Sequence, residues 1–216
     1  MARVKICGLN SAEAMQHALL ARADLVGLVF FPPSPRHVSV DEAVPIADYA
    51  RGFAAIVALT VDADDDLLAE IVTKVNPDML QLHGSESPAR VAQVRERFGK
   101  PVMKAIKVAT RLDADEALAY LDIADLILFD AKPPKGADRP GGHGATFDWS
   151  LLDAVKHKVP FMLSGGLTAQ NVAAAIQATG ATVVDVSSGV ESAPGVKNPA
   201  LIRAFIAAAH SVHTGT

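Results

Sequence analysis

The sequence is poor in cysteine, and its single cysteine, Cys7, excludes a disulfide within the chain. A lone thiol favours a reducing compartment. Residues 1–6, MARVKI, lack the apolar core of a secretory signal peptide. The longest apolar run, residues 25–31, is far shorter than the ~20 residues of a membrane-spanning helix. We therefore expect a cytoplasmic protein with no membrane partner.

Aromatic residues are also scarce, and neither sign of charge dominates. Aromatics make up 5% of the chain and hydrophobic residues 50%, so the predicted core is built from Val, Ile, Leu and Ala. Such a core suits buried parallel strands covered by Ala-rich helices. The 20 basic and 24 acidic residues are mixed along the chain, and no basic stripe is interleaved with aromatics. This pattern argues against nucleic acid as a partner.

Short apolar runs alternate with segments of helical period along the whole chain, and a helix is expected after each run. Polar residues mark three of the helix starts. Asn10 with Glu13 and Ser39 with Glu42 have the spacing of a capping box, and Ser87 stands before a proline as an N-cap does. Eight strands are predicted, at residues 4–7, 25–30, 54–59, 79–82, 102–106, 126–129, 161–163 and 183–186.

This alternation predicts a parallel sheet, because parallel strands need long crossover connections. Two α/β architectures compete, a closed barrel and an open doubly wound sheet. The open sheet favours Gly-x-Gly-x-x-Gly after the first strand, whereas Gly8 stands alone there. Eight regular units, with glycine pairs late in the chain, favour a single (β/α)₈ TIM barrel over residues 1–216.

Active-site residues of such a barrel lie at the C-terminal ends of the strands and in the loops that follow. The residues at these positions are far more polar than the strands themselves. The loop at 132–146, rich in Pro, Gly and Lys, is a candidate active-site loop. The candidate positions are Cys7, Arg36, His83, Asp130, and residues 141–144, 164–166 and 185–189.

The loops after the seventh and eighth strands read SGGL at 164–167 and SSGV at 187–190. Barrels often hold phosphate at these two loops. Glycines let backbone N–H groups approach an anion, and serine hydroxyls add donors. A single glycine pair serves a tight turn equally well, but two such loops in consecutive units predict a phosphate site.

Cys7 ends the first strand and Asp130 follows the sixth. A free cysteine is often only a small buried apolar residue, and an aspartate can be a helix cap or an ion-pair partner. Their positions favour chemistry instead. A reactive Cys7 needs its thiolate, so a nearby cation is expected to lower its pKa, and Lys5 lies on the same face of the strand. Partial desolvation is expected to raise the pKa of Asp130, which suits a general acid.

Arg36 and His83 each allow a structural and a functional interpretation. Arg36 is either an ordinary solvated arginine or the planar fork of donors that a substrate carboxylate needs. His83 is either a structural histidine or part of the site. His83, His143 and His157 have no recognised ligand spacing, so no metal site is predicted.

Together these segments resemble the phosphoribosylanthranilate isomerases of tryptophan biosynthesis. Each piece alone is weak, but they follow the family's order over almost the whole chain. They are residues 4–8 (VKICG), 34–36 (SPR), 81–84 (QLHG), 129–130 (FD), 141–142 (GG) with 147–149 (FDW), 164–167 (SGGL) and 185–191 (DVSSGVE).

The resemblance implies an Amadori rearrangement of a small phosphoribosyl substrate, N-(5-phosphoribosyl)anthranilate, without cofactor or metal. By matching position, Asp130 resembles the general acid that protonates the ring oxygen, and Cys7 resembles the base that removes the C2′ proton. Arg36 resembles the partner of the anthranilate carboxylate. His83 and Asp185 match residues near the sugar. Phosphate contacts are implied at Gly165, Gly166, Ser187, Ser188 and Gly189, with a further substrate contact at Gly142.

The sequence departs from the family at His143 and Ala145, where relatives commonly carry a small hydroxyl residue and a lysine, so we expect a retuned loop there. One rival is another phosphosugar isomerase barrel, such as an aminoimidazole-carboxamide ribotide isomerase, which predicts an acid in place of Cys7. A second rival is a non-catalytic phosphosugar-binding protein, which has no need for Cys7 and Asp130 together. A monomer and a homodimer are both compatible with the barrel.

Overall fold

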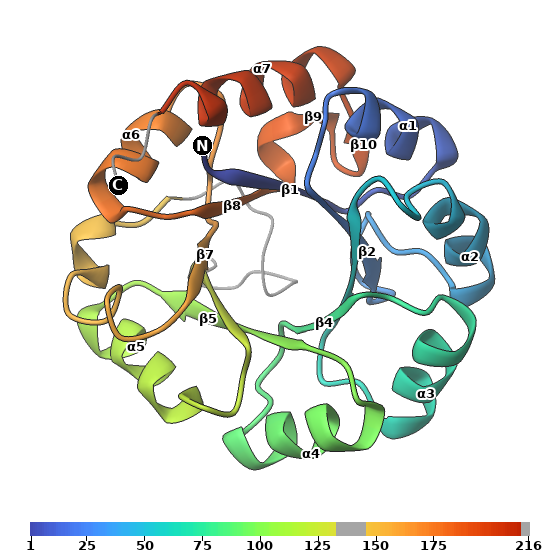
Figure 1. Ribbon diagram of the computed structural model, residues 1–216, viewed down its shortest axis with the longest axis horizontal. Coiled ribbons are helices and arrows are strands. Elements are labelled where there is room, and N and C mark those ends of the chain that lie inside the picture. Colours follow the sequence, from blue (N-terminus) through green and yellow to red (C-terminus); the bar gives the residue numbers. More distant parts are fainter. Residues whose placement is uncertain (133–145, 213–216) are drawn as a thin grey trace.

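The computed structural model describes residues 1–132 and 146–212. Eight parallel strands pair in the order β1 to β8 and close into a barrel, and helices form an outer ring around it (Figure 1). The closure is made by β1, where Lys5 pairs with Leu25 of β2 on one side and with Asp185 of β8 on the other. The predicted barrel is therefore confirmed.

The eight barrel strands lie close to their predicted positions. Three of them, β1, β5 and β6, are longer than predicted. Asp130 therefore belongs to the sixth strand instead of following it. The strands are β1 (Arg3–Cys7), β2 (Leu25–Phe30), β3 (Ala55–Thr60), β4 (Met79–Leu82), β5 (Val102–Val108), β6 (Leu126–Ala131), β7 (Phe161–Leu163) and β8 (Val183–Val186).

The helices are α1 (Ala12–Leu20), α2 (Val40–Asp48), α3 (Asp65–Lys74), α4 (Pro88–Phe98), α5 (Arg111–Asp115), α6 (Val172–Thr179) and α7 (Pro199–His210). None of the described helices is long and apolar enough to cross a membrane. The expected helix after β6 is not found in residues 146–160, which instead form the 3₁₀ helix η2 (Trp149–Leu152). A second 3₁₀ helix, η1 (Glu116–Tyr120), extends α5. A third, η3 (Ser188–Val190), and the hairpin β9 (Glu191–Ala193) and β10 (Val196–Lys197) lie between β8 and α7.

One of the predicted helix caps is wrong. Ser11, not Asn10, caps α1, because its extended backbone lets its side chain accept the N–H of Ala14 at 3.1 Å. The Asn10 amide instead donates to the Gly195 carbonyl at 3.2 Å, in the hairpin after β8. The capping box at the start of α2 and the Ser87 cap of α4 are confirmed.

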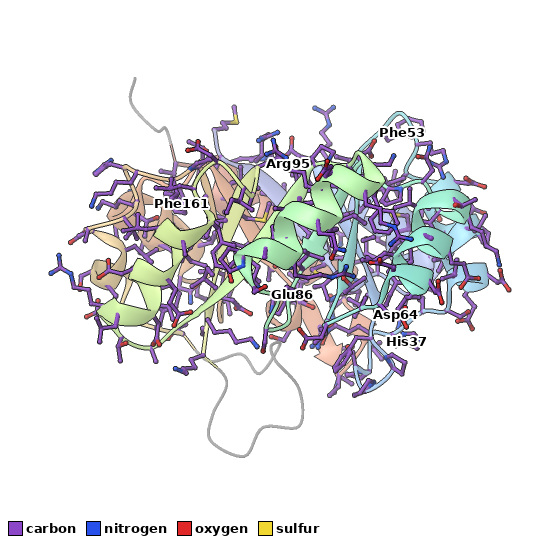
Figure 2. All side chains as sticks on the ribbon, turned by 90° about the horizontal axis from the view of Figure 1, so that it is seen from below. His37, Phe53, Asp64, Glu86, Arg95 and Phe161 are labelled. Carbon is purple, nitrogen blue, oxygen red and sulfur yellow. The ribbon has the colours of Figure 1, made fainter. Side chains whose placement is uncertain are left out.

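The barrel interior is apolar at the N-terminal end of the strands and polar at the C-terminal end. Side chains of one strand point alternately inward and outward, so β5 turns Met103, Ala105 and Lys107 inward, and β6 turns Leu128 and Asp130 inward. Figure 2 shows the C-terminal end on its lower side, where the loop residues His37, Asp64 and Glu86 lie. The polar end of the barrel is therefore where a site can form.

Three aspartates tie neighbouring strands together at the opposite, N-terminal end. Each stands directly before an even-numbered strand, and its carboxylate accepts an N–H near the start of the preceding odd-numbered strand. The backbone N–H of each aspartate donates back to the same residue's carbonyl. The pairs, with the distance of the bond to the carboxylate, are Asp24 with Val4 (2.8 Å), Asp78 with Ile56 (2.7 Å) and Asp125 with Val102 (2.8 Å).

Replacing Asp78 by Ala is expected to lower the free energy of unfolding by about 1–2 kcal/mol, because the Ile56 N–H loses a charged acceptor. Activity should be unchanged, since the bond lies at the end of the barrel remote from the polar mouth. Urea unfolding measures the change. Asp66→Ala, on the exposed face of α3, is the matched control, and equal stability of the two variants would contradict the expectation.

Candidate active site

Cys7 and Lys5 both point into the barrel from β1, as strand alternation predicts. Cys7 is 4% exposed and Lys5 is fully buried. Gly27 of β2 lies beside them, and a Cβ atom there would lie 3.0 Å from the Cys7 Sγ and 3.2 Å from the Lys5 Nζ. The absence of a side chain at Gly27 therefore makes room for both residues.

Lys5 is held by a buried carboxylate on the neighbouring strand. Its Nζ lies 2.9 Å from the Asp185 Oδ1, and the Ser164 hydroxyl donates to the Asp185 Oδ2 at 3.2 Å. Burial lowers the pKa of Lys5, but the Asp185 carboxylate outweighs burial and raises it above its ordinary value. Lys5 therefore stays a cation inside the barrel.

The pKa of the Cys7 thiol is raised overall, although Lys5 acts to lower it as the sequence predicts. Burial is the largest cause, and Asp185 adds to it. The charges of Lys5 and Lys197 act in the opposite direction but offset only part of the shift. Burial of the thiol is the main physical reason, and the Asp185 carboxylate that pairs with Lys5 also opposes a thiolate.

Asp130 meets His83 on another part of the same mouth. The Asp130 Oδ1 accepts the N–H of Ala131 at 2.9 Å, and its Oδ2 lies 3.3 Å from the His83 Nε2, in ionic contact when the ring is protonated. The Gln81 amide nitrogen lies 3.0 Å from the His83 Nδ1. With the amide as donor, a neutral ring carries its proton on Nε2, towards Asp130. The structure thus brings His83 and Asp130 together.

Arg36 is bound by an acid that the sequence did not single out as a partner. Its Nε and Nη2 donate to the two carboxylate oxygens of Glu191, each at 2.8 Å. The Lys197 Nζ donates to the Glu191 Oε1 at 2.6 Å. Burial acts to raise the pKa of Glu191, but these two cations outweigh it and hold the pKa low. Glu191 therefore fixes the guanidinium of Arg36.

Lys197 also connects this cluster to the first strand. Its Nζ donates to the Ser187 carbonyl at 3.0 Å, and the Ser187 hydroxyl donates to the Cys7 carbonyl at 3.1 Å. Burial is the main cause that lowers the pKa of Lys197, and Glu191 and Cys7 act against it. Sequence reasoning missed Lys197, because no local pattern shows that the hairpin folds back over β1.

The two predicted phosphate loops lie against each other. Gly165 and Gly166 have φ values of +91° and +61°, which favour glycine. A Cβ atom on Gly189 would lie 2.0 Å from the Leu167 carbonyl oxygen, so the second loop packs directly on the first. Ser188 begins the short helix η3, which forms most of the second loop. The predicted contact at Gly142 lies outside the described residues.

Lys107 is a further cation at the mouth that the sequence analysis did not predict. It pairs in register with Asp130 and is partly buried. Burial lowers its pKa, and the neighbouring charge of Lys104 lowers it further. The predicted fifth strand ended one residue too early to include it, although continuing the strand alternation would have turned it inward.

Comparison with known proteins agrees with this geometry. The family model of N-(5'-phosphoribosyl)anthranilate (PRA) isomerase matches residues 4–208. An N-(5'-phosphoribosyl)anthranilate isomerase of Rhodopseudomonas palustris strain BisA53 is 60% identical over 208 residues, which cover 96% of this chain and 95% of the relative. One from Bradyrhizobium sp. strain BTAi1 is 57% identical over the same shares.

Solved structures show the same similarity. A crystal structure of phosphoribosyl anthranilate isomerase from Thermotoga maritima has a TM-score of 0.89 and 35% identity, covering 98% of this chain and all 100% of that one. A phosphoribosyl anthranilate isomerase in complex with reduced 1-(o-carboxyphenylamino)-1-deoxyribulose 5-phosphate has a TM-score of 0.86 and 33% identity, with the same coverage. The chain therefore belongs to the N-(5'-phosphoribosyl)anthranilate isomerase family and is an isomerase of tryptophan biosynthesis.

Proposed function

We propose that the chain converts N-(5-phosphoribosyl)anthranilate into 1-(2-carboxyphenylamino)-1-deoxyribulose 5-phosphate, with Asp130 as general acid and Cys7 as general base. The observation that carries this assignment is the placement of the two residues. Both are buried at the C-terminal mouth of one barrel, on inward-facing positions of β1 and β6. An acid and a base on separate strands can act on two atoms of one bound substrate.

Asp130 begins the reaction by protonating the ring oxygen of the ribose. The anthranilate nitrogen supplies the electrons that break the ring C–O bond, which gives an open-chain Schiff base. The Ala131 N–H donates to one oxygen of the Asp130 carboxyl at 2.9 Å, and the His83 Nε2 lies 3.3 Å from the other oxygen. A carboxyl with one oxygen hydrogen-bonded and the other against His83 presents its proton in a defined direction.

Cys7 then removes the proton from C2′, and the resulting enolamine tautomerises to the ketone. The step needs the thiolate, which burial disfavours and the charges of Lys5 and Lys197 favour. The basicity of a thiolate rises with its pKa, so the few thiolates present are strong bases for a carbon acid.

The rest of the mouth binds the two ends of the substrate. The glycine loops at 164–167 and 187–190 suit its phosphate, and the fixed guanidinium of Arg36 suits the anthranilate carboxylate. Asp185 holds Lys5 and Ser164 near the sugar position. A cytoplasmic location and a monomeric or homodimeric state remain predictions.

Replacing Asp130 by Asn, or Cys7 by Ala, is expected to lower kcat by roughly 10²–10⁴-fold, the usual loss for a general acid or base. The decrease in anthranilate fluorescence on freshly generated substrate measures turnover. Asp66→Asn on α3 is the control. Near-native kcat in either site variant refutes the role assigned to that residue.

Replacing Arg36 by Lys is expected to raise KM roughly 10- to 100-fold. A lysine ammonium cannot offer the substrate carboxylate the planar set of donors of a guanidinium that Glu191 holds in place. Arg3→Lys, an exposed residue at the other end of the barrel, makes the same chemical change without touching the site. An unaltered KM for Arg36→Lys, measured in the same fluorescence assay, rules out the carboxylate contact.

The alkylation rate of the native protein by iodoacetamide is expected to keep rising with pH beyond 9, because burial raises the pKa of Cys7. Lys197→Met should move the curve to still higher pH, since it removes a charge that favours the thiolate. Cys7 is the only cysteine, so Cys7→Ala gives the unlabelled baseline. An alkylation rate of the native protein that levels off below pH 8 would contradict a raised pKa of Cys7.

A further inference from the structure

Two charged side chains are buried outside the barrel wall, beside the loop that carries His83. Lys104 is 2% exposed and Glu86 is 6% exposed. Lys104 lies on β5 between the inward-facing residues Met103 and Ala105, so it points away from the barrel interior. The Lys104 Nζ lies 2.6 Å from the Glu86 Oε2.

Lys104 binds the backbone on both sides of His83. Its Nζ donates to the Gly84 carbonyl at 2.8 Å and lies 3.4 Å from the Leu82 carbonyl. The N–H of His83 itself donates to the Thr60 carbonyl at 2.9 Å. One ammonium group therefore holds the backbone carbonyls of the residues on either side of His83.

Glu86 binds the same loop from its other side. Its Oε1 accepts the N–H of Gly84 at 3.0 Å and the N–H of Asp62 at 2.9 Å. A Cβ atom on residue 84 would lie 2.4 Å from the Asp62 Oδ1, so the two loops approach as closely as a glycine allows. The Tyr120 hydroxyl donates to the Glu86 carbonyl at 2.8 Å. The carboxylate thus joins the loop after β3 to the loop after β4.

Stability alone does not account for this pair. Replacing a buried ion pair by apolar residues is often neutral or stabilising, because desolvation of the two charges offsets their attraction. An apolar pair could not, however, bond the Gly84 carbonyl and the Gly84 N–H at once. What the charges add is the orientation of residues 82–84.

We propose that Lys104 and Glu86 are positioning residues for the isomerase reaction, which hold His83 at its contact with Asp130. The inference rests on the proposed role of Asp130. Without the pair, the peptides around His83 can rotate, and His83 no longer fixes the Asp130 carboxyl. Substrate binding depends on Arg36 and the glycine loops, so kcat falls while KM changes little.

The test is a double-mutant cycle on the full chain, with Lys104→Met, His83→Ala and the combined variant. Lys104→Met is expected to lower kcat roughly 10- to 100-fold, as a misplaced catalytic group does, with KM within about twofold. In the His83→Ala background the same substitution should lower kcat by less than about twofold. A purely structural role instead lowers kcat by the same factor in both backgrounds, and that result overturns the proposal.

Lys104→Met leaves Glu86 buried and unpaired, so this variant can fail to fold. Lys104→Met/Glu86→Gln leaves no unpaired charge and keeps an acceptor for the Gly84 and Asp62 N–H groups. It is expected to show the same loss of kcat, and native kcat in this folded variant overturns the proposal. Lys74→Met, which breaks an exposed ion pair with Glu70 on α3, is the control.

The cycle measures coupling between Lys104 and His83 and does not use Asp130. Near-native kcat in Asp130→Asn would therefore refute the acid assignment by itself, whereas additive losses in the cycle would refute only the positioning role.

Discussion

Closure of eight parallel strands into a barrel brings every strand's C-terminal end to one mouth, and the site depends on this constraint. Strand alternation then decides which residues enter the mouth and which face the helices. Strand β5, for example, directs Lys107 into the mouth and Lys104 towards the outside of the barrel. Residues far apart in sequence, such as Cys7 and Asp130, become parts of one site without any long-range motif.

Buried cations around the mouth are each paired with a buried carboxylate. Lys5 is paired with Asp185, Arg36 and Lys197 share Glu191, and Lys104 is paired with Glu86. Each acid reduces the field of the cation that it holds. Together with burial of the thiol, which is the larger cause, this effect keeps the pKa of Cys7 above its ordinary value despite the cations close to it. The pairs fix side-chain positions more than they set the charge of the site.

The sequence was sufficient to predict the barrel, the strand positions and the strand-end residues, because alternation and apolar runs are local patterns. It was also sufficient to place Lys5 beside Cys7. It could not show that Glu191 binds Arg36 or that Lys104 holds the His83 loop, because these contacts join loops of different strands. The prediction of Asn10 as a helix cap was wrong for a similar reason, because its amide donates a hydrogen bond to the Gly195 carbonyl in the hairpin after β8. Local spacing predicts elements, whereas barrel closure decides the partners.

The most direct measurement is a crystal structure of this chain with reduced 1-(o-carboxyphenylamino)-1-deoxyribulose 5-phosphate, the compound bound in a related isomerase. An acid–base pair at the mouth predicts the Cys7 Sγ within about 3.5 Å of C2′. It also predicts an Asp130 carboxyl oxygen within about 3.2 Å of the oxygen that closed the ribose ring. A complex in which either group lies beyond about 5 Å of its atom, too far for direct proton transfer, would contradict the assignment.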